Sequence, residues 1–157
     1  RYVTNYPSPG RRHIYSGLVE AIRHARKYIY ITTPYFVPTR RLARVLRLAA
    51  RRNVDVRIIM PERSNHPFVD VAARTFFSSM LSSGVRIFLY ESQNIHGKTT
   101  VIDGDWASIG TMNMDSISLL YNFEANIVST NPKFAEEVAA VFGRDLADAE
   151  EVCATCS

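Results

Sequence analysis

The 157-residue sequence predicts an α/β domain in which helices flank a mixed β-sheet. In its first half, segments with helical periodicity alternate with strand-like segments, which is typical of parallel strands joined by helices. In its second half, two short strand-like runs flank Gly104-Asp105, which predicts an antiparallel hairpin. Length alone predicts one domain over residues 1–157, because domains usually contain roughly 100–150 residues.

The first half is expected to contain three helices and two strands. Each helix has apolar residues at intervals of three or four, and each strand is rich in β-branched or aromatic residues and ends before proline. The expected elements are a helix opened by Ser8 and Pro9, a strand over Lys27–Thr33, a helix capped by Thr39 and ending near Arg52, a strand over Val54–Met60, and a helix opened by Pro67 with Gly84 at its C-cap.

The second half is expected to add strands and one closing helix. The expected elements are strands over Val85–Tyr90, Thr99–Asp103, Trp106–Gly110 and Phe123–Val128, and a helix capped by Asn131 and Pro132. Helical spacing predicts that this helix buries Phe134, Val138, Val141, Phe142 and Leu146.

The composition, 46% hydrophobic and 22% charged, is that of a globular protein. It excludes a disordered chain and a disulfide-dense scaffold. No apolar run approaches the roughly 20 residues of a membrane-spanning helix. Because the chain begins with Arg1 instead of Met, we expect it to be a processed or excised piece of a longer protein.

The charge is unevenly distributed. Residues 1–63 contain 14 Lys and Arg against three acidic residues, and residues 64–157 contain five against 12. Within the helix predicted after Thr39, Arg40, Arg44, Arg47 and Arg51 share one face. This face is either a solvated surface or a contact for an anionic partner, nucleic acid or an anionic membrane.

Both cysteines, Cys153 and Cys156, lie in the last five residues. A single pair supplies half of a zinc site, and no second pair completes it. A redox role would require a strand–helix setting that this tail lacks, so we expect a frayed end with free thiols.

The candidate catalytic residues lie in the segment over residues 95–113, IHGKTTVIDGDWASIGTMN. His96 and Lys98 are two apart, so an extended backbone projects them from one face. Thr111 and Asn113 follow the second hairpin strand. We therefore expect an imidazole, an ammonium, a hydroxyl and an amide at one end of the hairpin. This set suits a phosphodiester, with a nucleophile or base beside donors for the oxygens.

The order and spacing of these residues resemble the HKD motif of the phospholipase D superfamily, HxK-x4-D-x6-G[ST]xN. The matching positions are His96, Lys98, Asp103, Gly110, Thr111 and Asn113. The resemblance implies a phospholipase D-like αβα sandwich with a mixed central β-sheet flanked by helices.

Further segments are similar to the C-terminal half of bacterial cardiolipin synthases. They are TPYFVP at residues 33–38, VDVRIIMP, GVRIFLYE and NFE at residues 122–124. Tyr35 and Phe36 in the first segment fit either an apolar channel or the core. The sequence departs from this group at Ile117-Ser118, where the family often has Arg-Ser, so the head-group contact of that Arg is not expected.

The resemblance implies roles for four residues that bind or attack phosphate. His96 would be either the nucleophile that forms a phosphohistidine or the general acid/base that protonates the leaving alkoxide. Lys98 and Asn113 would hold the nonbridging oxygens, with assistance from Thr111.

Two carboxylates complete the expected catalytic set. Glu124 would hydrogen-bond the imidazole and hold its tautomer, as Asp does in a catalytic triad. Asp103 belongs to the motif, although in the family it is mainly a buried structural carboxylate. A covalent-histidine route requires no cofactor, and no metal is expected.

The family's active site contains two such motifs, whereas this sequence has one. The resemblance therefore implies half of an active site, completed by a second HKD half either in the same polypeptide or in a homodimer.

Three functions remain open from the sequence. The first is a cardiolipin synthase-like phosphatidyltransferase that acts on an anionic phospholipid, phosphatidylglycerol, at a membrane surface. Its expected location is the bacterial inner membrane, peripherally or as part of a membrane-anchored chain. The second is a homodimeric, metal-independent phosphodiesterase or nuclease, for which nucleic acid would be the partner. The third is a non-catalytic module that binds anionic lipid or nucleic acid.

Overall fold

The computed structural model describes residues 1–8, 10–63, 67–91 and 95–153 of the chain. Its centre is an eight-stranded sheet with the order β1-β9-β7-β6-β2-β4-β5-β10. The strands are β1 (Tyr2–Asn5), β2 (Tyr28–Thr32), β4 (Asp55–Pro61), β5 (Arg86–Tyr90), β6 (Thr99–Ile102), β7 (Trp106–Gly110), β9 (Glu124–Ser129) and β10 (Ala149–Glu151). β2, β4 and β5 are parallel, and the other neighbouring pairs are antiparallel. The mixed sheet predicted from the sequence is confirmed.

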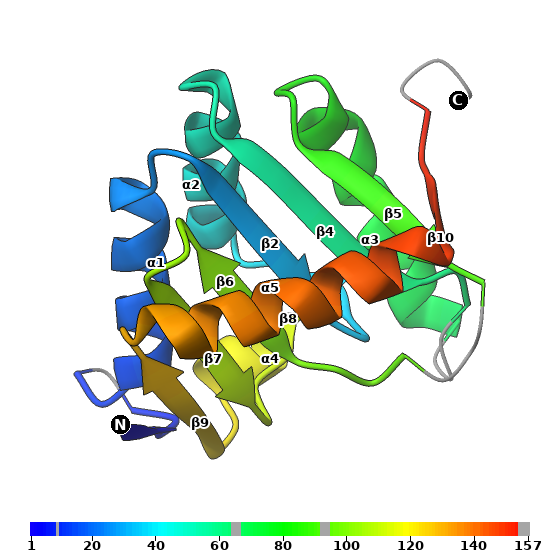
Figure 1. Cartoon of the computed structure of the whole chain (residues 1–157). Helices are drawn as coiled ribbons and strands as arrows, with labels where there is room; N and C mark the ends of the chain where they lie inside the picture. Colours follow the sequence, from blue (N-terminus) through cyan, green and yellow to red (C-terminus); the bar gives the residue numbers. More distant parts are fainter. Residues whose placement is uncertain (9, 64–66, 92–94, 154–157) are drawn as a thin grey trace.

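Helices cover both faces of this sheet (Figure 1). α1 (His13–His24), α2 (Arg40–Arg51) and α3 (Pro67–Leu81) lie on one face, and α5 (Pro132–Ala147) crosses the other. The short α4 (Ser116–Leu120) follows a two-stranded parallel sheet of β3 (Phe36–Val37) and β8 (Met114–Asp115). The expected αβα arrangement is therefore present. No helix in the described part of the chain is both long enough and apolar enough to cross a membrane.

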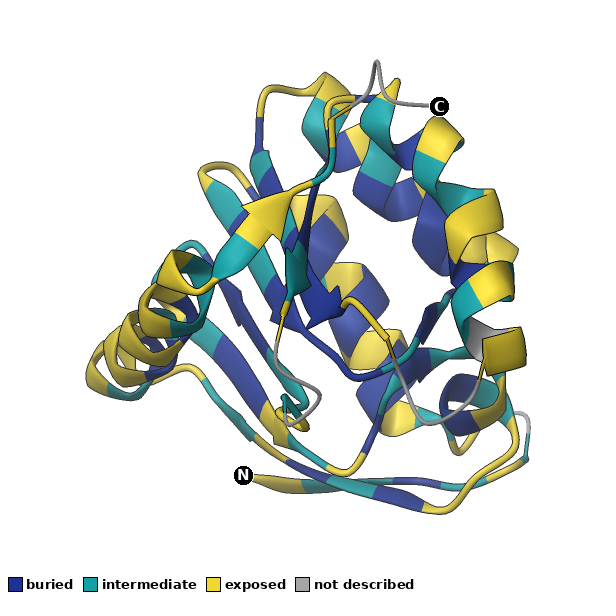
Figure 2. Cartoon of the chain, turned by 90° about the vertical axis from the view of Figure 1, so that its right-hand side faces the viewer, coloured by how far each residue is buried: buried dark blue, intermediate teal, exposed yellow. Residues whose placement is uncertain are grey.

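The main core lies between the sheet and α1–α3, where Figure 2 shows the buried positions in dark blue. Leu18, Leu46 and Met80 bring one fully buried side chain from each of these helices. A smaller core under α5 is built on Val138 and Phe142. Burial of such side chains stabilises the fold by about 1.5–3 kcal/mol each. Val141, expected inside, is 41% exposed, because the neighbouring Phe142 faces the sheet instead.

Local capping signals are confirmed at three helix ends. The Thr39 side chain accepts a hydrogen bond from the Leu42 amide, and that of Asn131 accepts one from Lys133. Gly84, at φ +91°, closes α3: its amide donates to the Leu81 carbonyl, and the next amide donates to the Met80 carbonyl. This is the Schellman pattern that favours glycine.

The predicted start of the first helix was wrong. α1 begins at His13, after an Arg12 whose side chain makes no cap hydrogen bond. Pro9 lies outside the described residues, and Gly10 has φ +79°, a left-handed conformation that a right-handed helix excludes. The Arg11 amide donates to the Ser8 carbonyl, so a turn precedes the helix.

The edge strands β1 and β10 were not expected. Ala149–Glu151 has little intrinsic strand propensity, yet it pairs with the exposed edge of β5. Arg86 donates to both carboxylate oxygens of Glu151 at 2.7 and 2.8 Å, which adds a side-chain link between the two strands. β10 ends before the cysteine tail for which a frayed end is expected. Cys153 is exposed beyond this strand, and Cys156 lies outside the described residues.

The predicted hairpin is present with its turn moved by one residue. Asp103 and Gly104 occupy the centre of the turn at φ 56° and 81°, and the Asp105 amide donates to the Ile102 carbonyl at 3.2 Å. Two central residues with positive φ give a type I′ geometry. Because β6 runs antiparallel to β2, with Thr99 opposite Thr32, β6 begins at the edge where β2 and β4 end.

Candidate active site

His96 and Lys98 lie immediately before β6, in a segment that is not part of a strand. The segment is nevertheless linked to the hairpin, because the Gly110 amide donates to the Lys98 carbonyl at 3.2 Å. The Lys98 ammonium donates to the His96 carbonyl oxygen at 3.2 Å. His96 is exposed, and its ring has no hydrogen-bond partner among the residues that the structure describes.

Thr111 and Glu124 meet at the same edge of the sheet. The Thr111 hydroxyl donates to Glu124 Oε2 and accepts a hydrogen bond from the Ala125 amide at 3.0 Å. Glu124 is buried, and its Oε1 accepts a hydrogen bond from Asn122 Nδ2 at 3.3 Å. Among the described residues, the Glu124 oxygens accept hydrogen bonds from Thr111 and Asn122, and no hydrogen bond joins Glu124 to the His96 imidazole, so the expected orienting role of Glu124 stays a prediction.

Glu124 also acts on Lys98. Partial burial lowers the pKa of the Lys98 ammonium from its ordinary value, and the Glu124 carboxylate partly offsets this effect. A cation and a carboxylate are therefore close enough to influence each other at the start of β6. An ammonium in such a position can face a phosphate oxygen.

The Asn113 side chain is held by Ser118: Asn113 Nδ2 donates a hydrogen bond to the Ser118 hydroxyl oxygen at 3.3 Å. Its Oδ1 is buried without a hydrogen-bond partner among the described residues. An amide nitrogen has two N–H donors, so one remains for a ligand oxygen. No role was predicted for Ser118 or Asn122 from the sequence. Only their positions could have indicated a role: Ser118 aligns with the Ser of the family's Arg-Ser pair, and Asn122 is the first residue of the NFE segment.

Gly110 permits the close approach of β7 and β9 on which this geometry depends. A Cβ atom at Gly110 would lie 2.3 Å from both the Ala125 carbonyl oxygen and Asn126 Oδ1. Asn126 is buried, and its Oδ1 accepts a hydrogen bond from the Met112 amide. The motif glycine thereby places Thr111 against β9.

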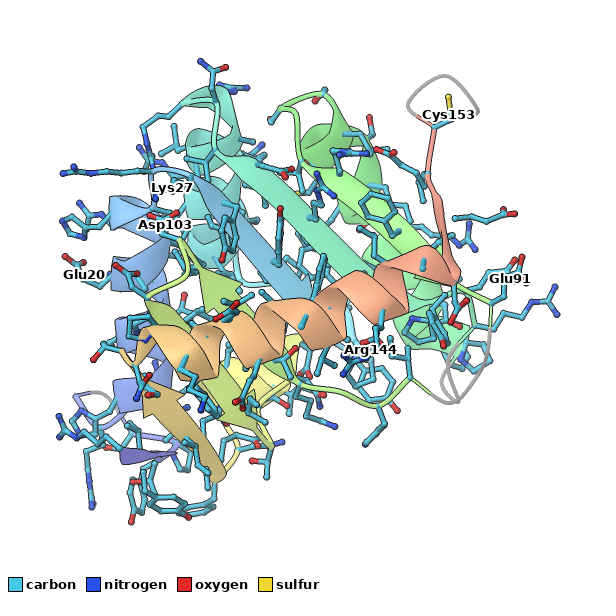
Figure 3. The ribbon with its side chains drawn as sticks, in the orientation of Figure 1. Glu20, Lys27, Glu91, Asp103, Arg144 and Cys153 are labelled. Carbon is cyan, nitrogen blue, oxygen red and sulfur yellow. The ribbon has the colours of Figure 1, made fainter. Side chains whose placement is uncertain are left out.

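Asp103 is separated from the other motif residues. It lies at the opposite end of β6 from Lys98, about 16 Å away along the strand. Its oxygens accept hydrogen bonds from the amides of Arg26, Lys27 and Tyr28 at 2.8–3.0 Å, beside the labelled Lys27 in Figure 3. Asp103 therefore joins the hairpin turn to the start of β2. Its grouping with the catalytic residues does not agree with this position.

Asp103→Ala is expected to reduce the free energy of unfolding by about 2–4 kcal/mol, because three amides lose their acceptor. Chemical denaturation measures this change. Asp103→Asn, which keeps one acceptor oxygen and tolerates the positive φ, should lose less. Turnover per folded molecule should stay within about threefold in both variants. A loss of turnover in fully folded Asp103→Asn would contradict the structural role.

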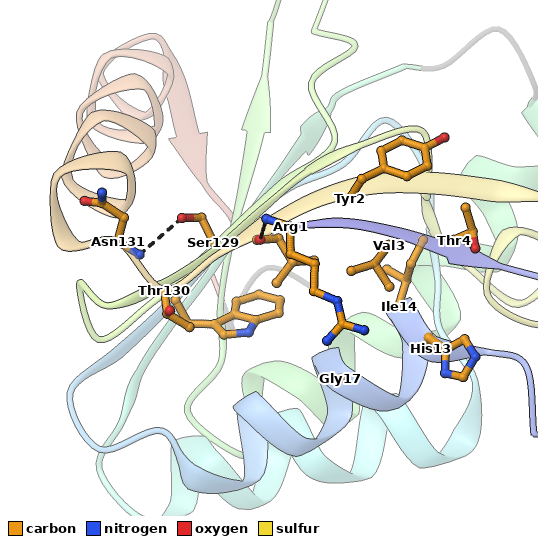
Figure 4. Close-up of a pocket in the computed structure, with 12 residues that line it drawn as sticks. Arg1, Tyr2, Val3, Thr4, His13, Ile14, Gly17, Ser129, Thr130 and Asn131 are labelled. Carbon is orange, nitrogen blue, oxygen red and sulfur yellow. Dashed lines mark hydrogen bonds between the residues drawn. The ribbon is translucent and has the colours of Figure 1, made fainter.

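Two hollows are considered for the candidate site. One, of about 400 Å³, is lined by Asn113 and Asn122 together with mostly apolar side chains. The other, of about 790 Å³, lies between β1, α1 and the start of α5 (Figure 4). Its lining includes Arg1, His13 and Trp106 but none of the six motif residues. The smaller hollow is therefore the one that belongs to the candidate site.

Comparison with known proteins agrees with the motif. The family model of the cardiolipin synthase, PLD-like domain matches residues 18–146. A cardiolipin synthase of Clostridium perfringens is 40% identical over 144 residues, which are 92% of this chain and 30% of that protein. Cardiolipin synthase A of Salmonella arizonae is 41% identical over 128 residues, 82% of this chain and 26% of that protein. The chain thus spans less than a third of these relatives.

Among solved structures, a phospholipase D family member, Nuc from Salmonella typhimurium, superposes with a TM-score of 0.78. The match covers 97% of both chains at 24% identity, which shows a shared fold. The family match, the two relatives and the motif agree. The chain therefore belongs to the cardiolipin synthase, PLD-like domain family of the phospholipase D superfamily.

Proposed function

We propose that this chain supplies half of the active site of a cardiolipin synthase-like phosphatidyltransferase that acts on phosphatidylglycerol. The observation that carries the proposal is the gathering of His96, Lys98, Thr111 and Asn113 at one edge of the sheet. The 35–41% identity to cardiolipin synthases supports the choice of lipid over other phosphodiesters. The proposal treats residues 1–157 as one domain.

The reaction proceeds in two displacements at phosphorus. In the first, an imidazole nitrogen attacks and the P–O bond to glycerol breaks, while the second histidine protonates the departing alkoxide. In the second, a hydroxyl of another phosphatidylglycerol gives its proton to that histidine and attacks, and the P–N bond breaks. The products are cardiolipin and one glycerol. His96 takes either role, and Lys98 and Asn113 hold the nonbridging oxygens.

This chemistry requires a second histidine that faces His96. We propose that a second HKD half supplies it, either in the same polypeptide or from another copy related by a twofold axis through the site. The proposal predicts that catalytic turnover accompanies the paired state. A strictly monomeric 157-residue chain that turned over substrate would overturn the half-site argument.

The test incubates the chain with phosphatidylglycerol vesicles and, separately, with DNA, both in EDTA, and measures glycerol release, cardiolipin and strand cleavage. Release of one glycerol per cardiolipin in the chelator is the expected result. Loss of all activity in EDTA would contradict the covalent-histidine route. DNA cleavage without lipid turnover would favour the second candidate, a homodimeric phosphodiesterase or nuclease. If the paired state binds lipid or DNA without turning either over, the third candidate, a non-catalytic binding module, would be favoured.

The arginine face of α2 supports an anionic membrane surface as a partner. Arg40, Arg44 and Arg51 are exposed and Arg47 is half-buried, and none forms an ion pair with another described residue. Leu48 lies among them and is 42% exposed. An apolar side chain among unpaired cations suits a bilayer surface better than a nucleic-acid backbone. We infer a location at the bacterial inner membrane, peripherally or within a membrane-anchored chain.

Replacing Arg44, Arg47 and Arg51 together by glutamine should weaken partition onto phosphatidylglycerol vesicles roughly 100-fold, since each surface cation contributes about 1 kcal/mol. Cosedimentation with vesicles measures the effect. The matched control replaces Arg1, Lys133 and Arg144, an equal charge change outside α2 that should alter binding much less, because Arg1 precedes the edge strand β1 and the other two lie on α5, across the sheet from α2. An equal decrease in both variants would contradict a specific role for the arginine face.

A further inference from the structure

The hollow of about 400 Å³ beside Asn113 has an apolar wall built from separate parts of the chain. Tyr35 precedes β3, Phe68 lies in the first turn of α3, and Ile117 lies in α4. Phe68 is 91% exposed and Ile117 is 63% exposed. Two large apolar side chains line one hollow and remain exposed to water. Covering them with an apolar ligand would lower the free energy of the system.

The charge of the lining restricts that ligand. The described lining contains no Lys, Arg or His and one carboxylate, Asp115. Asp115 Oδ1 accepts hydrogen bonds from the amides of Ile117 and Ser118, so it is the N-cap of α4. A second phosphate placed here would find no cation and a nearby negative charge. The next phosphate of a nucleic-acid backbone therefore does not suit this hollow.

The hollow shares residues with the candidate site. Asn113 and Asn122 belong to its lining, and Asn122 donates to Glu124, the acceptor of the Thr111 hydroxyl. A group in the hollow could thus belong to the same molecule as a phosphate held at the candidate site. The volume lies within the roughly 300–1,000 Å³ of small-molecule sites.

Building on the proposed function, we propose that this hollow receives the acylglycerol end of a lipid phosphodiester, next to the phosphate. Phe68 and Ile117 are the positions that select an acyl chain. The replacement of the family's frequent Arg by Ile117 then gives this chain an apolar contact at a position where that family often has a cation.

The test compares two probes in binding to the chain in the oligomeric state that it adopts. One is dihexanoyl phosphatidylglycerol below its micellar concentration, and the other is the deacylated glycerophosphoglycerol. Titration calorimetry should show tighter binding of the acylated probe. The Phe68→Ser/Ile117→Ser double variant should reduce this preference about tenfold, because it removes two apolar contacts. The control variant, Val71→Ser/Val141→Ser, removes exposed apolar side chains outside the hollow and should retain the preference.

Equal binding of the two probes by the unmodified chain would overturn the inference, as would an equal loss of preference in both variants. Sedimentation of the double variant provides a further test: if it dissociates a dimer, the hollow is a subunit interface and the inference is wrong. Failure of the proposed reaction is distinguishable, because it appears as absent glycerol release, a measurement that these binding titrations do not contain.

Discussion

His96→Ala is expected to reduce glycerol release from phosphatidylglycerol on the order of 10⁴-fold or more, because the reaction loses either its nucleophile or its proton donor. Neither role has a substitute in the described site: Lys98 is the nearest motif base, and its ammonium is needed as a cation. The free energy of unfolding should change by about 0.5 kcal/mol or less, since the side chain is exposed and has no described partner.

The measurement pairs turnover with chemical denaturation of the same samples. His24→Ala is the control, because His24 is an exposed histidine at the end of α1 that contacts only Glu20 among the described residues. It should retain activity. If His96→Ala kept more than about a tenth of the turnover, the covalent-histidine proposal would fail. If it unfolded instead, the exposed position of the ring would be wrong.

Gly110→Ala is expected to cause the largest loss of stability among the glycine substitutions, about 3 kcal/mol or more. The added Cβ would lie 2.3 Å from the backbone oxygen of Ala125, and backbone cannot move aside as a flexible side chain can. β7 and β9 must separate to accept it. This separation would also withdraw Thr111 from Glu124 and release the buried Asn126 from its partners.

Gly17→Ala is the matched control. Gly17 lies inside α1, and a Cβ there would meet nothing within 4 Å. The substitution should raise stability by about 0.5–1 kcal/mol through higher helix propensity. Thermal or denaturant unfolding measures the change in the free energy of unfolding of both variants. A Gly110→Ala protein as stable as the parent would show that the two strands do not approach as closely as described.

The parts of the fold that depend on neighbouring residues in sequence were predictable. Thr39, Asn131 and Gly84 each satisfy backbone groups a few residues away, so the sequence contains the whole interaction. The Ser8-Pro9 signal failed because Gly10 adopts a left-handed conformation that ends any helix begun there. β10 was missed because its partner strand β5 lies about 60 residues earlier in the chain, and a pairing over that separation leaves no local signal.

The candidate site shows the same division. Six motif positions were found by their spacing, but the partner of Glu124 was not, because Thr111 reaches it only through the β7–β9 pairing. Asp103 belongs to the motif in sequence but lies far from Lys98 in space, because the four residues of β6 separate the two. Spacing along a chain therefore identified the residues without identifying which of them meet.

The insertion of antiparallel β6 beside β2 has a consequence for how such a protein diversifies. Every chain segment that enters the site arrives as a connection at one rim of the sheet, while the turn anchored by Asp103 lies at the other. Substitutions such as Ile117 can accumulate along the first rim without loosening the core beneath α1–α3. Residues that would set substrate preference and the turn that anchors the fold therefore lie at opposite ends of the same strands. A substitution at one end can change substrate preference without weakening the anchor at the other.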